Sequence, residues 1–280
     1  MKKNLFITAA LSLLFLSGSL QAQTKTCCKS TSTGEFAMLG SDVAFQSAHL
    51  APVPFNFVPI KGEAVTFPVA DGKEGHAYLV KATEKSDQYL FVFHEWWGLN
   101  DHIRQEAEKF AEDFPGVNIM AIDLYDGQIA TNAEDAGKIM QSIQQERAEA
   151  IINGAINYAG RSASFKTIGW CFGGAWSLQA AIIMGSRAKG CVMYYGMPEK
   201  NPEKLKLIQA PVLGIFATRD SWITKPVVEA FEAQMKEMKK PVTITWFEAD
   251  HAFANPSNPK FDEAATAKAR MMSVAFLKSK

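Results

Sequence analysis

The chain has 280 residues, of which 48% are hydrophobic and 21% are charged, a composition typical of a globular protein with a well-buried core. Lysine plus arginine and aspartate plus glutamate both number 29, and neither sign forms a stripe or a block. This balance argues against a nucleic-acid-binding protein and against one held on an anionic membrane.

The first 22 residues have the pattern of a secretory signal peptide. A positive start, Met1 to Asn4, precedes an apolar run from Leu5 to Leu16 and a small-residue cleavage region that ends at Ala22. The apolar run is short for a membrane span, although an uncleaved anchor remains the alternative. We therefore expect an exported protein, periplasmic or secreted, with no stable membrane association after cleavage.

Four cysteines do not form an evident disulfide framework, although export leads to an oxidising compartment. Cys27 and Cys28 are adjacent in a polar stretch that we expect to be disordered, and Cys191 lies in an apolar strand and is expected to pack in the core. If Cys171 is catalytic, it must be kept reduced by shielding.

Residues 23–60 are predicted to form a tail and an extended lead-in, because three prolines between residues 52 and 59 disfavour helix. Residues 61–280 are predicted to form one α/β domain. It opens with a β-hairpin over residues 64–69 and 77–81, which would add an antiparallel edge to the sheet.

Strands and helices alternate from residue 89 onward. Strands that are apolar on both faces and alternate with amphipathic helices predict a mostly parallel sheet with helices on both faces. The predicted strands are 89–93, 117–122, 190–195, 211–217 and 242–247. The predicted helices are 101–113, 133–158 with a break near Gly154, 226–239 and 261–277. A further strand and the helix after it together span 165–186.

The stretch Gly169-Trp170-Cys171-Phe172-Gly173 has the spacing of a nucleophile elbow, with cysteine where serine usually stands. Glycines flank the strained position because strand and helix must approach closely there. The Phe172 amide would be free at a helix N-terminus to bind a developing oxyanion, and the same helix end favours thiolate over thiol. An inert buried cysteine in a glycine-rich turn is the alternative interpretation.

Two later strands place an acid and a histidine at the same edge of the sheet. Asp220 follows the strand over residues 211–217, and His251 follows the strand over residues 242–247. The order Cys171, Asp220, His251 is that of the α/β-hydrolases, in which the nucleophile attacks a carbonyl, the histidine transfers protons and the carboxylate fixes its tautomer. Asp250 is a poor candidate, because an immediate neighbour in extended chain points away from His251.

The loop after the first central strand supplies further candidates. The second oxyanion donor of this fold comes from that loop, which indicates the Trp96 amide. Glu95 lies in aromatic surroundings, where burial would favour its neutral form, although a glutamate capping the next helix is the alternative.

These residues together resemble the dienelactone hydrolase family. The resemblance runs from about residue 62 to the C-terminus and is carried by Phe93–Asn100, Asp123-Leu124-Tyr125, Gly169–Gly174, Asp220 and His251-Ala252-Phe253. It implies an α/β-hydrolase fold and a triad of Cys171, Asp220 and His251. It also implies that Glu95 pairs with the resting thiol and moves when substrate binds, to help generate the thiolate.

The chain departs from the family where two arginines hold the substrate carboxylate. The corresponding positions are Gly127 and Asn255, so an anionic dienelactone should bind poorly. An aromatic pocket for a less charged ester or lactone is predicted instead, although a tryptophan pair can also be core. Its predicted lining is Trp96, Trp97, Tyr125, Trp222 and Phe253.

The predicted function is an exported carboxylic-ester or lactone hydrolase that forms a thioester on Cys171. The partner is a small-molecule substrate, the expected state is a monomer, and no cofactor, metal cluster or phosphate loop is predicted. One alternative is an exported ligand-binding protein that kept the fold without turnover. Another is a thiol-redox protein, which the absence of a Cys-x-x-Cys pair disfavours.

Overall fold

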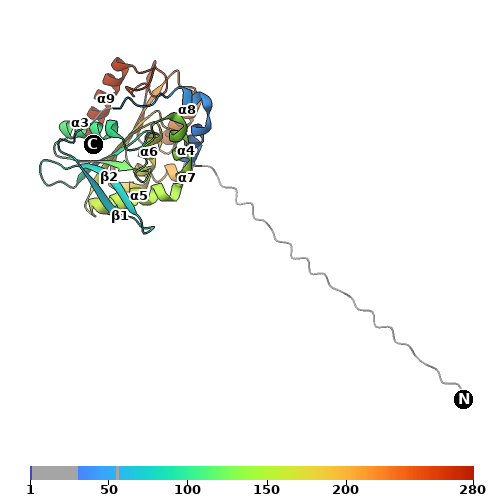
Figure 1. Cartoon of the computed structure of the whole chain (residues 1–280), viewed down its shortest axis with the longest axis horizontal. Helices are drawn as coiled ribbons and strands as arrows, with labels where there is room; N and C mark the ends of the chain where they lie inside the picture. Colours follow the sequence, from blue (N-terminus) through green and yellow to red (C-terminus); the bar gives the residue numbers. More distant parts are fainter. Residues whose placement is uncertain (2–30, 55–56) are drawn as a thin grey trace.

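The computed structural model describes residue 1, residues 31–54 and residues 57–280 (Figure 1). The predicted signal peptide, Cys27 and Cys28 lie outside the described residues. Within the described part of the chain, no helix combines the length and the apolar character that crossing a bilayer requires.

An eight-stranded sheet forms the centre of the molecule, in the order β1-β2-β4-β3-β5-β6-β7-β8. β1 and β2 are antiparallel and form the predicted hairpin edge, whereas every pairing from β4 to β8 is parallel. β4 and β7 are buried along their whole length, which matches their continuous apolar sequences. The strands are β1 (Glu63–Pro68), β2 (Glu74–Val80), β3 (Gln88–Phe93), β4 (Asn118–Asp123), β5 (Ser164–Trp170), β6 (Ala188–Tyr194), β7 (Val212–Ala217) and β8 (Val242–Phe247).

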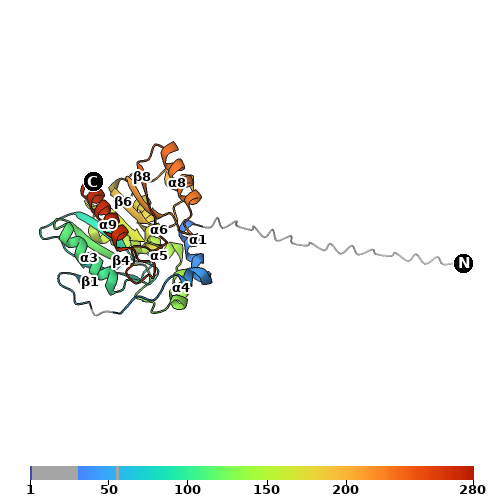
Figure 2. The same ribbon diagram turned by 90° about the horizontal axis from the view of Figure 1, so that it is seen from above.

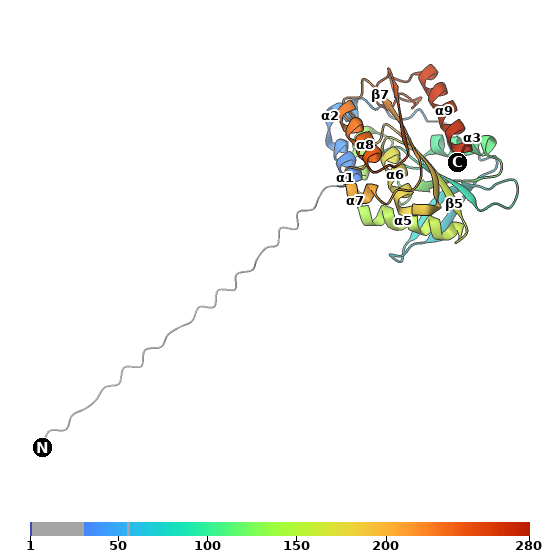
Figure 3. The same ribbon diagram turned by 180° about the vertical axis from the view of Figure 1, so that it is seen from behind.

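Helices cover both faces of this sheet, as predicted. α3 and α9 pack on one face, and α5, α6 and α8 lie on the other (Figures 2 and 3). An ion pair between Arg270 and Asp113 joins α9 to α3 at 2.7 Å. The larger helices are α3 (Asp101–Asp113), α4 (Ala133–Ser142), α5 (Gln145–Ala159), α6 (Phe172–Met184), α8 (Lys225–Glu237) and α9 (Glu263–Lys278), and shorter ones are α7 (Pro202–Leu205), η1 (Leu39–Ser41) and η2 (Gly185–Arg187).

The prediction of extended chain before residue 60 is wrong for residues 32–47. This segment forms α1 (Ser32–Met38), η1 and α2 (Val43–Ser47), which pack against α4, with α1 also against α6. Thr31 and Asp42 cap the two α-helices through their side-chain oxygens, and Phe36 and Phe45 are completely buried. The prolines act only on the coil that follows, so capping and two buried aromatic rings decide the structure of the earlier residues.

The predicted break near Gly154 is also wrong. The break falls at residues 143–144, where Ile143 has an extended backbone, and Gly154 lies inside α5. A Cβ atom on Gly154 would approach the Phe67 ring and the Pro68 carbonyl to 3.0 Å. This glycine therefore allows α5 to pack closely on β1, and it does not interrupt the helix.

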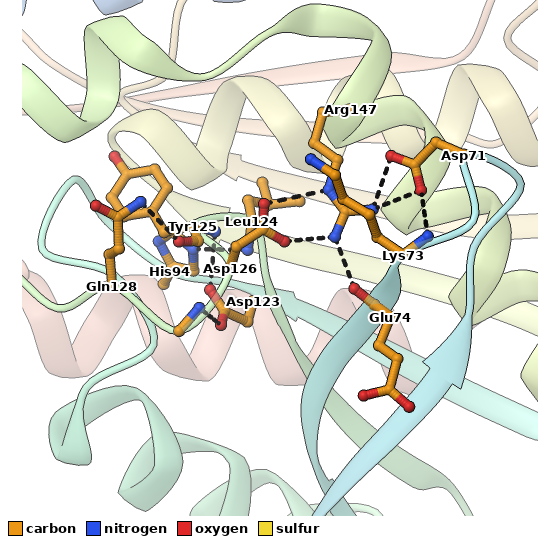
Figure 4. Close-up of polar contacts among 11 residues, drawn as sticks. Asp71, Lys73, Glu74, His94, Asp123, Leu124, Tyr125, Asp126, Gln128 and Arg147 are labelled. Atoms are coloured by element: carbon orange, nitrogen blue, oxygen red, sulfur yellow. Dashed lines mark hydrogen bonds and ion pairs between the residues drawn. The ribbon is translucent and has the colours of Figure 1, made fainter.

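A buried guanidinium fixes the loops at the hairpin end of the sheet (Figure 4). Arg147 on α5 contacts Asp71 at 3.0 Å and Asp126 at 2.5 Å, and it donates to the Glu74 carbonyl at 2.6 Å. Only 11% of its side chain is exposed. Because Asp126 belongs to the loop after β4, this cluster orders the chain next to the site described below.

Candidate active site

Cys171 occupies a sharp corner between β5 and α6. Its backbone φ is 57° and its ψ is −121°, a region that residues with a Cβ atom rarely adopt. A Cβ atom on Gly169 would lie 2.1 Å from the Gly173 carbonyl oxygen, and one on Gly173 would lie 2.3 Å from the Phe93 carbonyl oxygen. The two glycines are therefore sterically required, as the motif predicted, and the strained corner presents the sulfur at the carboxyl edge of the sheet.

Asp220 and His251 form a buried, charge-assisted pair. The Nδ1 atom of His251 lies 2.6 Å from Oδ2 of Asp220. Oδ1 of Asp220 accepts hydrogen bonds from the amides of Trp222 and Ile223, both at 2.9 Å. Burial alone would raise the pKa of Asp220, but His251 and these amides outweigh burial and hold that pKa below its ordinary value. The carboxylate therefore fixes the imidazole with Nε2 directed away from it.

The Cys171 sulfur and a ring nitrogen of His251 are no more than 4.8 Å apart. Because Nδ1 of His251 is held by Asp220, Nε2 is the nitrogen available to the thiol. The three residues named from the sequence thus meet in one place.

The surroundings of the Cys171 sulfur oppose its ionisation. Burial raises the pKa of Cys171 well above its ordinary value, and the negative charges of Glu95 and Asp220 add to this effect. The amides of Phe172 and Trp96 donate toward the sulfur and lower the same pKa, but by less. The Phe172 amide at the helix end thus acts in the expected direction, toward thiolate, but desolvation outweighs it.

Glu95 lies in the same buried space, 8% exposed. Its Oε2 accepts a hydrogen bond from the Asn255 side-chain amide at 2.5 Å. Burial raises the pKa of Glu95 to about 7, against opposing effects of His251, Asn255 and Tyr195. The carboxyl group can therefore gain or lose a proton near neutral pH beside the sulfur.

The raised pKa of Glu95 predicts a pH-dependent stability difference between the parent and a Glu95→Gln variant. An unfolded chain releases this proton near pH 4.5 and the folded chain near pH 7, so the parent loses stability as the pH rises through this window. At about 1.4 kcal/mol per pH unit, the loss relative to Glu95→Gln is about 3 kcal/mol at pH 8. Urea unfolding at pH 4.5 and pH 8 measures it.

Glu146→Gln is the matched control, because Glu146 is exposed on α5. The free energy of unfolding of this variant should change between the two pH values as that of the parent does. If the free energy of unfolding of Glu95→Gln differed from that of the parent by the same amount at pH 4.5 and pH 8, the raised pKa of Glu95 would be contradicted.

His94, the other histidine that follows a central strand, has a structural position (Figure 4). Its Nδ1 lies 2.6 Å from the Glu95 carbonyl oxygen, and its Nε2 accepts from the Leu124 amide at 3.1 Å. Burial lowers its pKa, so the ring stays neutral and ties the loop after β3 to the loop after β4. The predicted oxyanion donor Trp96 belongs to the loop after β3 that this connection holds.

Residues of the N-terminal segment cover the triad, and sequence reasoning missed them. The Phe45 ring lies 5.6 Å from the His251 ring and 5.2 Å from the Trp96 ring, centre to centre. The His49 ring lies 5.3 Å from the His251 ring and is 3% exposed. Trp222 donates to Asp42 at 3.3 Å, which fixes the segment over the site. Cys171 is completely buried beneath this arrangement.

A cavity of about 400 Å³ adjoins the site on the side of Glu95. Of the predicted pocket residues, only Trp97 lines it. Tyr125 packs against His94 and Phe172, Phe253 packs against Tyr195, and Trp222 lies half-buried beside Phe45. Their role as substrate contacts stays a prediction. The cavity lining further includes Asn100, Phe110, Trp170, Asn255, Phe261 and Arg270.

The fold and the site together define an α/β-hydrolase: a mostly parallel sheet carries a nucleophile at a strained strand–helix corner, followed in sequence by an acid and a histidine. The profile of the Dienelactone hydrolase family matches residues 76–280, and the chain belongs to this family. It is a hydrolase that acts on ester or lactone bonds.

Comparison with individual proteins agrees with this family. The chain is 28% identical over 204 residues to Protein usf of Aquifex pyrophilus, which covers 68% of this chain and 87% of that protein. It is 27% identical over 216 residues to Carboxymethylenebutenolidase 1 of Cupriavidus pinatubonensis, a match that covers 72% of this chain and 90% of that protein. The structure of a dienelactone hydrolase-like promiscuous phosphotriesterase from metagenomic libraries superposes with a TM-score of 0.68 at 20% identity, over 79% of this chain and 99% of that one.

Proposed function

We propose that this hydrolase cleaves an uncharged or weakly charged carboxylic ester or lactone through a thioester on Cys171. The observation that carries the proposal is the geometry of three groups. The sulfur stands at the strained corner, a ring nitrogen of His251 lies within 4.8 Å of it, and Asp220 holds the opposite ring nitrogen at 2.6 Å.

The chemistry begins with a proton transfer. His251 Nε2 takes the thiol proton and the sulfur attacks the carbonyl carbon, so the carbonyl oxygen becomes an oxyanion. The amides of Trp96 and Phe172, which already donate toward the sulfur, are placed to bind that oxyanion. Collapse breaks the bond to the alkoxy oxygen, which receives the proton from His251. For a lactone, the released hydroxyl group remains attached to the acyl chain.

Hydrolysis of the thioester completes the cycle. A water molecule gives a proton to His251 and attacks the acyl carbon, and the thiolate that leaves takes the proton back. Ionised Glu95 is a second acceptor for the thiol proton, because its pKa of about 7 allows it to act near neutral pH. Glu95 would thus help to generate the thiolate, the role that the family resemblance implies. Its hydrogen-bond partner in the structure is Asn255.

The preference for a less charged substrate is supported by the charges at the site. By the family resemblance, Asn255 and Gly127 correspond to the two arginines that hold a substrate carboxylate, and Asn255 is bonded to Glu95. The cations that line the cavity are already paired: Arg270 contacts Asp113 at 2.7 Å, and Lys109 contacts Glu106 at 2.6 Å. A free carboxylate on the substrate would therefore lack an unpaired guanidinium partner at these positions.

The experiment is a panel of ester and lactone pairs that differ only in a methyl ester against a free carboxylate. We expect kcat/KM to be at least about tenfold higher for the neutral member of each pair, since a charge-assisted pair is missing. Rapid acid quench and intact-mass measurement should show one acyl group on Cys171. Preference for the anionic members would contradict the specificity, and tight binding without turnover would instead favour a ligand-binding relative.

Export is part of the proposal. It is supported by the positive start, the apolar run and the cleavage region within residues 1–22, and by the burial of Cys171, which shields the thiol from oxidants. N-terminal sequencing of the protein recovered from the host should begin after Ala22. A mature chain that retains Met1 in the cytosolic fraction would contradict export.

A further inference from the structure

Three metal-binding side chains meet at the candidate active site. His49, Cys171 and His251 come from the end of the N-terminal segment, the elbow and the loop after β8. One ligand atom of each lies within 4.8 Å of the others, and all three residues are buried. The sequence predicted no metal-ligand cluster, because these residues are far apart along the chain and only the fold brings them together.

The two imidazoles are already oriented as metal ligands are. His251 uses Nδ1 to bond the Asp220 carboxylate, and His49 uses Nδ1 to bond the Phe45 carbonyl oxygen at 2.6 Å. Metal-bound histidines commonly donate their second nitrogen to a carboxylate or a backbone carbonyl in this way. The Nε2 atoms of both rings are buried and have no hydrogen-bond partner among the residues that the structure describes. Their lone pairs are therefore available near the sulfur.

The surrounding charges suit a divalent cation. Glu95 and Asp220 lie close enough to the Cys171 sulfur to interact with it electrostatically. The Asp220 carboxylate and the thiolate supply two negative charges, and ionised Glu95 adds a third, so a buried dication would not be left uncompensated. Two imidazole nitrogens and one thiolate are the ligand types that zinc prefers, and a three-residue set leaves a fourth position for solvent or a ligand.

We propose that His49, Cys171 and His251 bind one zinc ion, and that this ion and ester hydrolysis exclude each other. The exclusion follows because the ion would occupy Cys171 Sγ and His251 Nε2, the two atoms that the hydrolytic cycle needs. Ligand atoms of a tetrahedral zinc site lie about 3.3–3.8 Å apart, so the side chains would have to draw together by no more than about 1.5 Å. Zinc binding is independent of the proposed hydrolytic function and goes beyond it.

The test uses the mature chain, reduced and stripped of metal, in a Cys27→Ser/Cys28→Ser background, because those thiols could also bind zinc. Calorimetric titration with zinc should give one site per chain. His49→Gln should weaken binding by at least about 100-fold, since even loss of a residue that only supports a ligand costs 10- to 100-fold. His76→Gln is the matched control on β2 and should bind as the background does.

Two further readouts test the ligand set without a variant at His49. Zinc-edge X-ray absorption on the background protein should show one sulfur and two imidazole ligands. Cobalt substitution should give a thiolate charge-transfer band that disappears in Cys171→Ala.

Zinc should also inhibit ester hydrolysis, and a chelator should restore it. In His49→Gln, the zinc concentration that inhibits hydrolysis should rise by the same factor as the dissociation constant for zinc.

The outcomes separate the two proposals. Absence of one-to-one binding, a sulfur-free ligand shell, or His49→Gln binding within threefold of the background would overturn the zinc site. Hydrolysis measured with chelator present tests the proposed function alone. Zinc binding in a protein without ester turnover would support this inference and reject the hydrolytic one.

Discussion

Replacing Cys171 by alanine is expected to lower kcat/KM for p-nitrophenyl acetate by at least about 10³-fold. The substitution removes the atom that would form the thioester and leaves the oxyanion donors and the Asp220–His251 pair in place, so only a small residual rate should remain. Initial rates on the mature, reduced chain measure the effect. The intact mass after quench should show no acyl adduct.

Cys191→Ala is the matched control. Cys191 is a second completely buried cysteine, with its sulfur 3.5 Å from the Ser177 hydroxyl and its pKa raised to about 11 by burial. It packs between β6 and α6, away from the strand ends, so its loss should affect stability slightly and activity little. If Cys171→Ala kept the parent rate, or if both variants lost activity equally, the assignment of the nucleophile would be wrong.

Replacing Asp220 by asparagine is expected to lower kcat by about 10³- to 10⁴-fold with a much smaller change in KM. Asparagine keeps the shape and can still accept from the Trp222 amide, but it cannot hold His251 in the tautomer whose Nε2 is free to accept the thiol proton. It also removes the charge that stabilises the imidazolium formed during attack. Steady-state kinetics with a neutral ester provides the measurement.

Asp250→Asn tests whether a nearby carboxylate alone would suffice. Asp250 is the immediate neighbour of His251, but its carboxylate points to Arg219 at 3.2 Å and is 32% exposed. Because exposed ion pairs contribute little, this variant should retain nearly the full rate and stability of the parent. Equal loss of activity in Asp220→Asn and Asp250→Asn would contradict the assigned roles.

The sheet was predictable because its signals are local. Continuous apolar runs such as the one in β7 predict buried parallel strands, and the carboxyl ends of such strands meet at one edge. The spacing of Gly169, Cys171 and Gly173 predicts the corner, since strand and helix can approach only where the flanking residues lack a Cβ atom. These rules were enough to bring Cys171, Asp220 and His251 to one place.

Local signals were less reliable where packing decides the outcome. The helices before residue 48 depend on Phe36 and Phe45 being buried against the rest of the molecule, and Gly154 stays inside α5, where it allows close packing on β1. Neither contact leaves a periodic pattern in its own segment. A polar cap at Asp42 was the signal that could have indicated the second of these helices.

The amino-acid sequence by itself determined the order of the strands and of the larger helices from residue 63 onward, the strained corner and the three residues predicted to form the triad, because these depend on residue types in local patterns. Only the tertiary structure decided that His49 joins the site, that Asn255 bonds Glu95 and that burial outweighs the helix end at the Cys171 sulfur. Proton affinity depends on how completely water is removed and on which charges come near, and both are set by contacts between residues far apart in the chain.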